Sequence, residues 1–155
     1  MTKLPFLAVC CGNADRGDDA AGPLVADRLR GMGVPVRLNA GDALGLLSDF
    51  DAAEHVVLVD AVVTGAPPGT ILHWDACRER LPAGAFACST HSIGICEAVE
   101  LARVLDQLPA RCTIFGIAAD HFDAGSPVSS EVADAVDEAA RRIRAEQCIL
   151  VNECA

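Results

Sequence analysis

The fold of this chain is decided by residues 11–23, whose sequence is CGNADRGDDAAGP. An apolar run from Leu4 to Cys10 precedes this segment and predicts a first strand. Apolar residues at helical spacing follow it and predict a helix over about 19–31. The segment is therefore the loop of a strand–loop–helix unit, from which α/β proteins are built.

The same alternation of strands and helices continues along the rest of the chain. Further strands are predicted at 34–38, 55–59, 70–74 and 112–117, and further helices at about 43–51, 93–105 and 129–146. The link from the third strand to the fourth is too short for a helical crossover, so the fourth strand is expected to run antiparallel to the third. Ser129 or Ser130 is placed to cap the last helix. The pattern predicts one α/β domain over 1–155.

Composition and charge narrow the class of protein. Hydrophobic residues make up 52% of the 155 residues and aromatic residues only 4%, which suits strands buried on both faces. The formal net charge of -10 argues against nucleic acid or an anionic membrane as partner. No apolar run is long enough to span a membrane, and no signal-peptide pattern is seen, so a cytoplasmic protein is expected. A domain of this size needs no partner to fold, so a monomer is expected.

The eight cysteines do not form a metal-binding pattern. None are spaced C-x-x-C, so a zinc site built from thiolates has little support. Several lie in apolar segments, where Cys behaves as a small hydrophobic residue. Most are therefore expected to be reduced core residues, and Cys148 and Cys154 are the two expected to oxidise in air.

Three positions predict a metal site at one rim of the sheet. Asp18 and Asp19 follow the first strand, and Asp60 closes the run of the third. The carboxyl ends of parallel strands meet at one rim, and His91 opens the helix before the fifth strand. Two carboxylates and one imidazole hold a divalent metal with an open position, which is the usual design of a catalytic site. Asp19, Asp60 and His91 are the candidate ligands, with His121 in reserve.

Each candidate also has a structural interpretation. Asp18 and Asp19 stand where a helix begins, and carboxylates are favoured there by capping and by the helix dipole. Asp60 suits a turn or cap, and a single His at a helix start, like His91, is more often structural. The residues alone leave both interpretations open.

Several short motifs occur together and in order over about 4–146. They are Gly12-Asn13, Gly17-Asp18-Asp19-Ala20-Ala21-Gly22-Pro23, Val57-Leu58-Val59-Asp60-Ala61, Thr90-His91-Ser92-Ile93-Gly94, Phe115-Gly116-Ile117 and Ser126-Pro127. In this combination of motifs the chain resembles the hydrogenase maturation endopeptidases. The fold implied is a three-layer α/β/α arrangement around a mixed, mostly parallel five-stranded sheet (phosphorylase/hydrolase-like) with strand four antiparallel.

The resemblance implies a metal-dependent endopeptidase that removes the C-terminal extension of a [NiFe]-hydrogenase large-subunit precursor. The family's metal-contacting positions fall on Asp19, Asp60 and His91. The metal implied is nickel already inserted in the precursor, although another divalent metal can replace it in vitro. Asp18 and Asp19 are the candidate catalytic residues, with Asp18 as base or as support for the ligands. One departure is Asn39-Ala40-Gly41-Asp42, where many members have Asp-Gly-Gly.

Two other functions stay open from the sequence. A non-catalytic module that senses metal or docks on a hydrogenase subunit would keep the same surface but give no shorter product. A flavodoxin-like nucleotide binder would use the loop after the first strand for phosphate. Asp15, Asp18 and Asp19 would repel phosphate there, and the G-x-G-x-x-G motif is absent. The peptidase is therefore preferred.

Overall fold

The computed structural model describes residues 2–40, 42–82, 84 and 94–154. The five strands are β1 (Leu4–Cys11), β2 (Val36–Asn39), β3 (Ala53–Val62), β4 (Ile71–Asp75) and β5 (Arg111–Ala118). The helices are the short 3-10 turn η1 (Gly17–Ala20) and the α-helices α1 (Ala21–Gly31), α2 (Ala43–Ala52), α3 (Ile95–Val104) and α4 (Ser130–Cys154).

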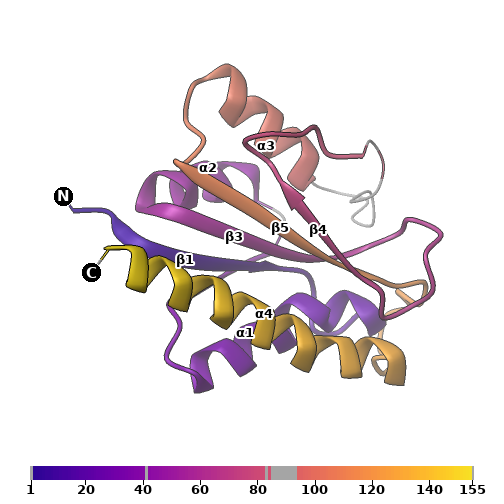
Figure 1. Cartoon of the computed structure of the whole chain (residues 1–155). Helices are drawn as coiled ribbons and strands as arrows, with labels where there is room; N and C mark the ends of the chain where they lie inside the picture. Colours follow the sequence, from indigo (N-terminus) through magenta and orange to yellow (C-terminus); the bar gives the residue numbers. More distant parts are fainter. Residues whose placement is uncertain (1, 41, 83, 85–93, 155) are drawn as a thin grey trace.

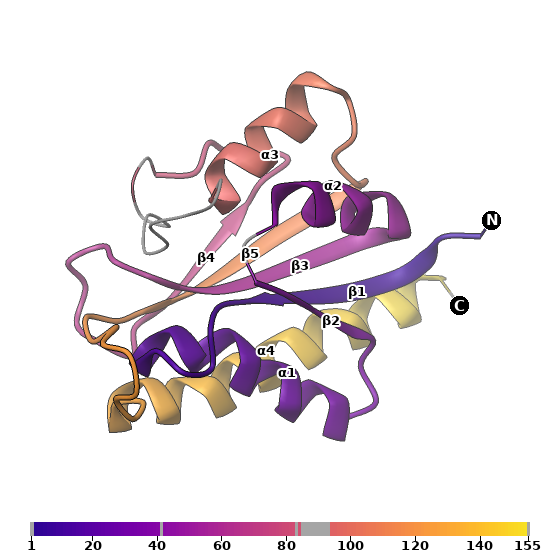
Figure 2. The same ribbon diagram turned by 180° about the vertical axis from the view of Figure 1, so that it is seen from behind.

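These elements form the predicted three layers (Figure 1). The sheet order is β2-β1-β3-β5-β4. All pairs are parallel except β4, which runs antiparallel to β5. Helices α1 and α4 cover one face of the sheet, and α2 and α3 cover the other (Figure 2). The expected antiparallel fourth strand is confirmed, and β5 is the strand with which it pairs.

Alternation along β1 shows why the sheet is buried on both sides. Phe6 and Cys10 pack in the cluster formed with α1 and α4, whereas Leu7 and Val9 pack in the cluster formed with α2 and α3. Side chains of a strand point alternately to opposite faces, so a strand covered on both sides needs a continuous apolar sequence. The high apolar and low aromatic content of the chain follows from this arrangement.

The first helix begins later than the sequence predicts. The prediction placed Asp19 in its first turn, but residues 17–20 form η1 and the α-helix starts at Ala21. The reason is local: the amide of Asp19 bonds to the carbonyl of Arg16, and the amide of Asp18 bonds outward to the carbonyl of His121. Both carboxylates therefore belong to the loop rather than to α1.

The third strand is longer than predicted, and Asp60 does not close it. β3 continues to Val62 because β5 runs alongside it, with Asp60 opposite Gly116 and Val62 opposite Ala118. The second strand is likewise displaced, to Val36–Asn39 instead of 34–38. The residues before and after Asp60 are thus both paired with β5, and this pairing fixes the backbone of Asp60.

The last helix differs from the prediction at both ends. It extends to Cys154 rather than ending at 146. The predicted cap is not made by a serine hydroxyl, because the buried Oγ of Ser129 has no hydrogen-bond partner. The amide of Ser129 instead donates to Oδ1 of Asp18 at 2.8 Å. A carboxylate from the first loop therefore occupies the start of α4, where the helix dipole favours negative charge.

Gly22 shows why the opening motif requires a glycine after the two alanines. A Cβ atom at this position would overlap the backbone carbonyl of Cys11. Only glycine lets α1 approach the end of β1 this closely. The close approach brings the loop that carries Asp19 next to the rim of the sheet.

Within the described residues, no helix is both long and apolar enough to cross a membrane. Six cysteines in this part of the chain are free thiols, and Cys10, Cys11 and Cys112 among them are buried. Cys148 is exposed, as expected for a residue prone to oxidation. The interpretation as small core residues is thus confirmed for three cysteines, whereas Cys77 is exposed and Cys96 is half-buried, so it does not hold for most of them.

Candidate functional site

Asp19 is positioned by the loop that follows β1. Its Oδ2 accepts a hydrogen bond from the amide of Asn13 at 2.9 Å, which closes the loop across six residues. The side chain is partly buried, and this burial raises the pKa of the Asp19 carboxyl. The Asn13 amide and the positive charge of Arg16 act in the opposite direction. Asp19 is thus held in place but remains at the edge of solvent.

Asp60 lies near the carboxyl end of β3, beside the η1 loop. Burial raises the pKa of its carboxyl well above the ordinary value of 3.8, and the negative charge of Asp19 raises it further. The amide of Ala61 opposes this change. Asp19 and Asp60 therefore interact directly through their charges, as expected for two residues on one rim.

Positive charge balances this pair of carboxylates only in part, because the charge of Arg16 lowers the pKa of Asp19 less than burial raises it. Neither Asp19 nor Asp60 forms an ion pair with a lysine or arginine within the described part of the chain. Two close carboxylates in a low-dielectric setting repel each other and favour proton or cation uptake. Oxygen ligands of this kind accept a divalent ion. The pair is therefore suited to receive a cation from outside.

The third predicted ligand, His91, lies outside the described residues, so the complete triad stays a prediction. No group of three or more metal-binding side chains is found among the residues that the structure describes. His121 lies on the same rim after β5, but its side chain is 67% exposed and contacts Asp120 at 3.3 Å. The reserve ligand therefore points to solvent.

Asp18 occupies a different environment from its neighbour. Its side chain is fully buried and accepts the amide of Ser129 on Oδ1 at 2.8 Å and the amide of His121 on Oδ2 at 3.4 Å. Its own amide donates to the carbonyl of His121 at 2.7 Å. Asp18 therefore ties η1 to the loop between β5 and α4 and so supports the rim on which Asp19 lies. No observation tests its predicted part in catalysis.

Cys11 is a neighbour of the pair that the sequence did not single out. Burial raises the pKa of its thiol, and the negative charges of Asp60, Asp49 and Asp19 act in the same direction. The signal was present in the sequence, because Cys11 is the last residue of β1 and directly precedes the loop. Its thiol adds an uncharged, polarizable wall to the site.

Comparison with known proteins shows to which family this architecture belongs. The model of the hydrogenase maturation protease family (HycI) matches residues 37–146. This chain belongs to the hydrogenase maturation protease family. Among curated proteins, none matches the chain.

Solved structures agree in fold with this maturation protease. The hydrogenase maturating endopeptidase HybD from E. coli has a TM-score of 0.75 at 22% identity, with 92% of this chain and 91% of that chain covered. The [NiFe] hydrogenase maturation protease HybD from Thermococcus kodakarensis has a TM-score of 0.68 at 24% identity, covering 94% and 99%. The endopeptidase HycI from Escherichia coli has a TM-score of 0.69 at 22% identity, covering 93% and 92%.

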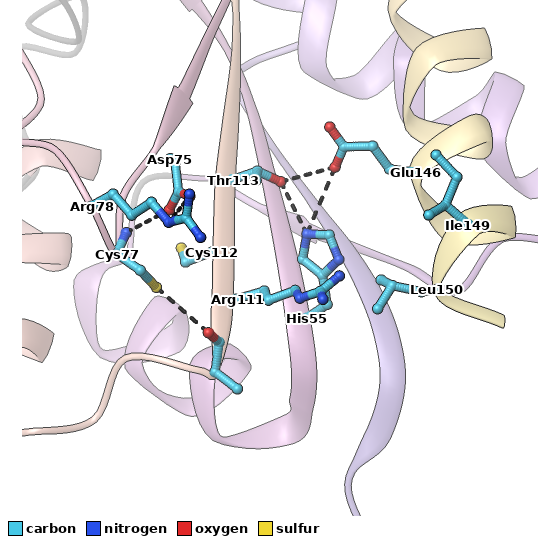
Figure 3. Close-up of a pocket in the computed structure, with 11 residues that line it drawn as sticks. His55, Asp75, Cys77, Arg78, Arg111, Cys112, Thr113, Glu146, Ile149 and Leu150 are labelled. Atoms are coloured by element: carbon cyan, nitrogen blue, oxygen red, sulfur yellow. Dashed lines mark hydrogen bonds and ion pairs between the residues drawn. The ribbon is translucent and has the colours of Figure 1, made fainter. Parts of the chain in front are cut away.

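A second polar cluster of this maturation protease lies at the opposite end of the sheet, near the first residues of β3 and β5 (Figure 3). It lines a cavity of about 400 Å³. Nε2 of His55 lies 3.1 Å from Oγ1 of Thr113, whose hydroxyl donates to Oε2 of Glu146 at 3.2 Å. Nε2 of His73 reaches Oε1 of the same Glu146 at 3.0 Å. The cluster joins α4 to the sheet, far from Asp19 and Asp60.

His55 makes the folding stability of this protease depend on pH. Burial lowers the pKa of its imidazole from 6.5 to about 4, helped by the positive charge of Arg111. Between these values the unfolded chain binds a proton that the folded chain refuses, so folding stability is lost as the pH falls from 6.5 towards 4. We expect His55 to account for a loss of about 2–3 kcal/mol over this interval.

Urea unfolding measured across the interval checks the His55 prediction. The His55→Gln variant should show a pH dependence that is shallower than that of the wild type by the same amount. His73→Gln, which removes a half-exposed imidazole bonded to the same Glu146, is the comparison variant. Because the charge of His73 contributes least to the lowered pKa of His55, this variant should keep most of the wild-type slope. Equal slopes for His55→Gln and the wild type would contradict the prediction.

Proposed function

We propose that this protease removes the C-terminal extension of a [NiFe]-hydrogenase large-subunit precursor after nickel has been inserted. Asp19, Asp60 and His91 contact the nickel that the precursor carries. The observation that supports this proposal is the pair Asp19 and Asp60, whose negative charges interact and which forms no ion pair with a lysine or arginine in the described part of the chain. The printed names of the structural neighbours, which are hydrogenase maturation proteases, agree with the substrate class.

The ligand set suits recognition of a metal that belongs to the substrate. Two carboxylates and one imidazole bind a borderline divalent ion less tightly than thiolates or three histidines do. Weak binding lets the processed subunit leave with its nickel. The nickel of a loaded precursor would offset the repulsion between the two carboxylates and so contribute to binding. A precursor without nickel would lack this contribution and would bind more weakly.

The chemical roles follow from the different positions of the two neighbouring aspartates. Asp19 is the one at the solvent edge, where water can reach it. We assign one of its carboxylate oxygens to contact the nickel and the other to accept a proton from the attacking water, and the nickel would polarise the carbonyl of the bond that is cut. Asp18 acts indirectly, by holding the β5–α4 loop through its bonds to His121 and Ser129.

Incubation with nickel-loaded and nickel-free precursor tests the proposal. Intact mass spectrometry of the large subunit should show loss of a C-terminal peptide in the loaded sample only. Equal cutting of both samples would show that cleavage does not depend on nickel. Cutting of neither would favour a docking module over a peptidase. The proposal also places the protease in the cytoplasm, which its free thiols support, and as a monomer, because a domain of this size needs no partner to fold.

A further inference from the structure

The outer edge of β2 is an open strand edge that ends at the site. β2 pairs with β1 alone, and in the described part of the chain no strand lies on its other side. Figure 2 shows β2 at the near side of the sheet, with α2 above it and α1 below. An open edge presents backbone donors and acceptors to any extended chain that lies beside it.

The hydrogen bonds to β1 show which groups of β2 are available. The amide of Ala8 donates to the carbonyl of Pro35 at 3.0 Å, and the amide of Gly12 donates to that of Asn39 at 3.4 Å. Bonding residues alternate along a parallel strand, so odd-numbered positions of β2 face β1. The amides and carbonyls of Val36 and Leu38 therefore point away from the sheet.

The opposite edge of the sheet is less open. Thr70 and Ala76, at the two ends of β4, form backbone hydrogen bonds with Ala118 and Cys112 of the β5 side. Hydrogen-bonded pairs alternate along an antiparallel strand, so the backbone groups of Ile71, His73 and Asp75 face outward. The outward amide of Asp75 is already bonded to Oε1 of Glu79 at 2.8 Å, and the His73 side chain is held by Glu146. Capping of this kind protects an edge from strand addition.

The β2 edge is also continuous with the candidate site. Asn39, the last residue of β2, lies opposite Cys11, and a Cβ atom at Gly12 would overlap the carbonyl of Asp19. Leu38 lies on the edge strand with 54% of its surface exposed. A chain that pairs with β2 and leaves at its carboxyl end therefore arrives at the rim with an apolar contact already made.

We propose that the extended C-terminal segment of the precursor adds to β2 as a further strand, with an apolar side chain against Leu38. This inference rests on the proposed function and names how the substrate is held. Strand addition gives affinity through backbone bonds and specificity through alternate side chains. The added strand would lie three strand spacings, roughly 14 Å, from β3, which carries Asp60, because β2 and β1 stand between them. The paired segment thus lies about four residues or more from the bond that is cut.

Leu38→Pro is the most selective test, because proline removes only the outward amide and is tolerated on an edge strand. With nickel-loaded precursor we expect KM to rise about three- to tenfold, which is the value of one lost hydrogen bond, with kcat nearly unchanged. Leu38→Ala, which keeps the amide, should raise KM less. Arg37→Pro removes an inward amide and also the ion pair of Arg37 with the buried Asp49, so it should lower the melting temperature, whereas Leu38→Pro should not.

Hydrogen exchange gives a readout that does not depend on cutting. A synthetic peptide that spans the cleavage site should slow exchange of the Val36 and Leu38 amides and leave Ile71 and His73 on β4 unchanged. Protection at β4 instead, or an unchanged KM for a folded Leu38→Pro variant, would overturn strand addition at β2. If the wild type cuts no precursor, the proposed function fails, and the exchange pattern still decides where the peptide binds.

Discussion

Replacing Asp60 with Asn is expected to raise the free energy of unfolding at neutral pH by about 1–3 kcal/mol, although it removes a site residue. The folded chain holds this carboxylate buried, beside the negative charge of Asp19. An amide of the same shape removes the cost of burying an unbalanced charge. Urea unfolding at neutral pH, with wild type and variant in parallel, measures the difference.

The pH dependence of this gain identifies its cause. The pKa of Asp60 is higher in the folded chain than its ordinary value of 3.8, so the wild type is most stabilised by this group below that value and loses the contribution as the pH rises. The difference in the free energy of unfolding between Asp60→Asn and the wild type should therefore vanish near pH 3.8. Asp51→Asn, at an exposed aspartate, should change stability by no more than about 0.5 kcal/mol. A less stable Asp60→Asn variant at neutral pH would contradict the account.

Replacing Asp18 with Ala is expected to destabilise the fold by about 3 kcal/mol, the opposite of the effect at Asp60. The Asp18 side chain is fully buried and accepts the amides of Ser129 and His121. Truncation leaves both donors without a partner and removes negative charge from the start of α4. Urea unfolding reports the loss, and hydrogen exchange should be faster at these two amides than in the wild type.

Asp15→Ala is the matched control for Asp18→Ala. Asp15 lies in the same loop but is exposed, so its loss should cost no more than about 0.5 kcal/mol. An Asp18→Ala variant as stable as Asp15→Ala would show that the β5–α4 loop does not depend on this carboxylate. The two adjacent aspartates of the opening motif would then have to share one role at the rim.

Most of the fold could be predicted because periodicity records burial directly. The run from Val56 to Val59 is apolar without interruption because β3 is covered on both faces, and short-range patterns of this kind need no knowledge of distant residues. The antiparallel fourth strand followed from the length of one connection. Strand ends were less predictable, since β3 runs past Asp60 only because β5 lies beside it.

The site could be predicted only in part, because its distinctions depend on distant contacts. The sequence places Asp18 and Asp19 side by side and cannot show that one is bonded to the amide of Ser129, 111 residues away. It likewise offers the hydroxyl of Ser129 as a cap, where the structure uses Asp18 instead. Asp60 was found because an acid that closes an apolar strand must be hydrogen-bonded or bound to a cation if it is buried. His91 lies outside the described residues and rests on the sequence resemblance.

The central claim is that Asp19, Asp60 and His91 together recognise nickel in the precursor. The most direct measurement is the mass of nickel-loaded precursor after incubation with the wild type, Asp60→Asn and His91→Ala in parallel, each variant first shown to be folded. The account predicts a shortened subunit with the wild type and uncut precursor with both variants. Full processing by either folded variant would contradict it.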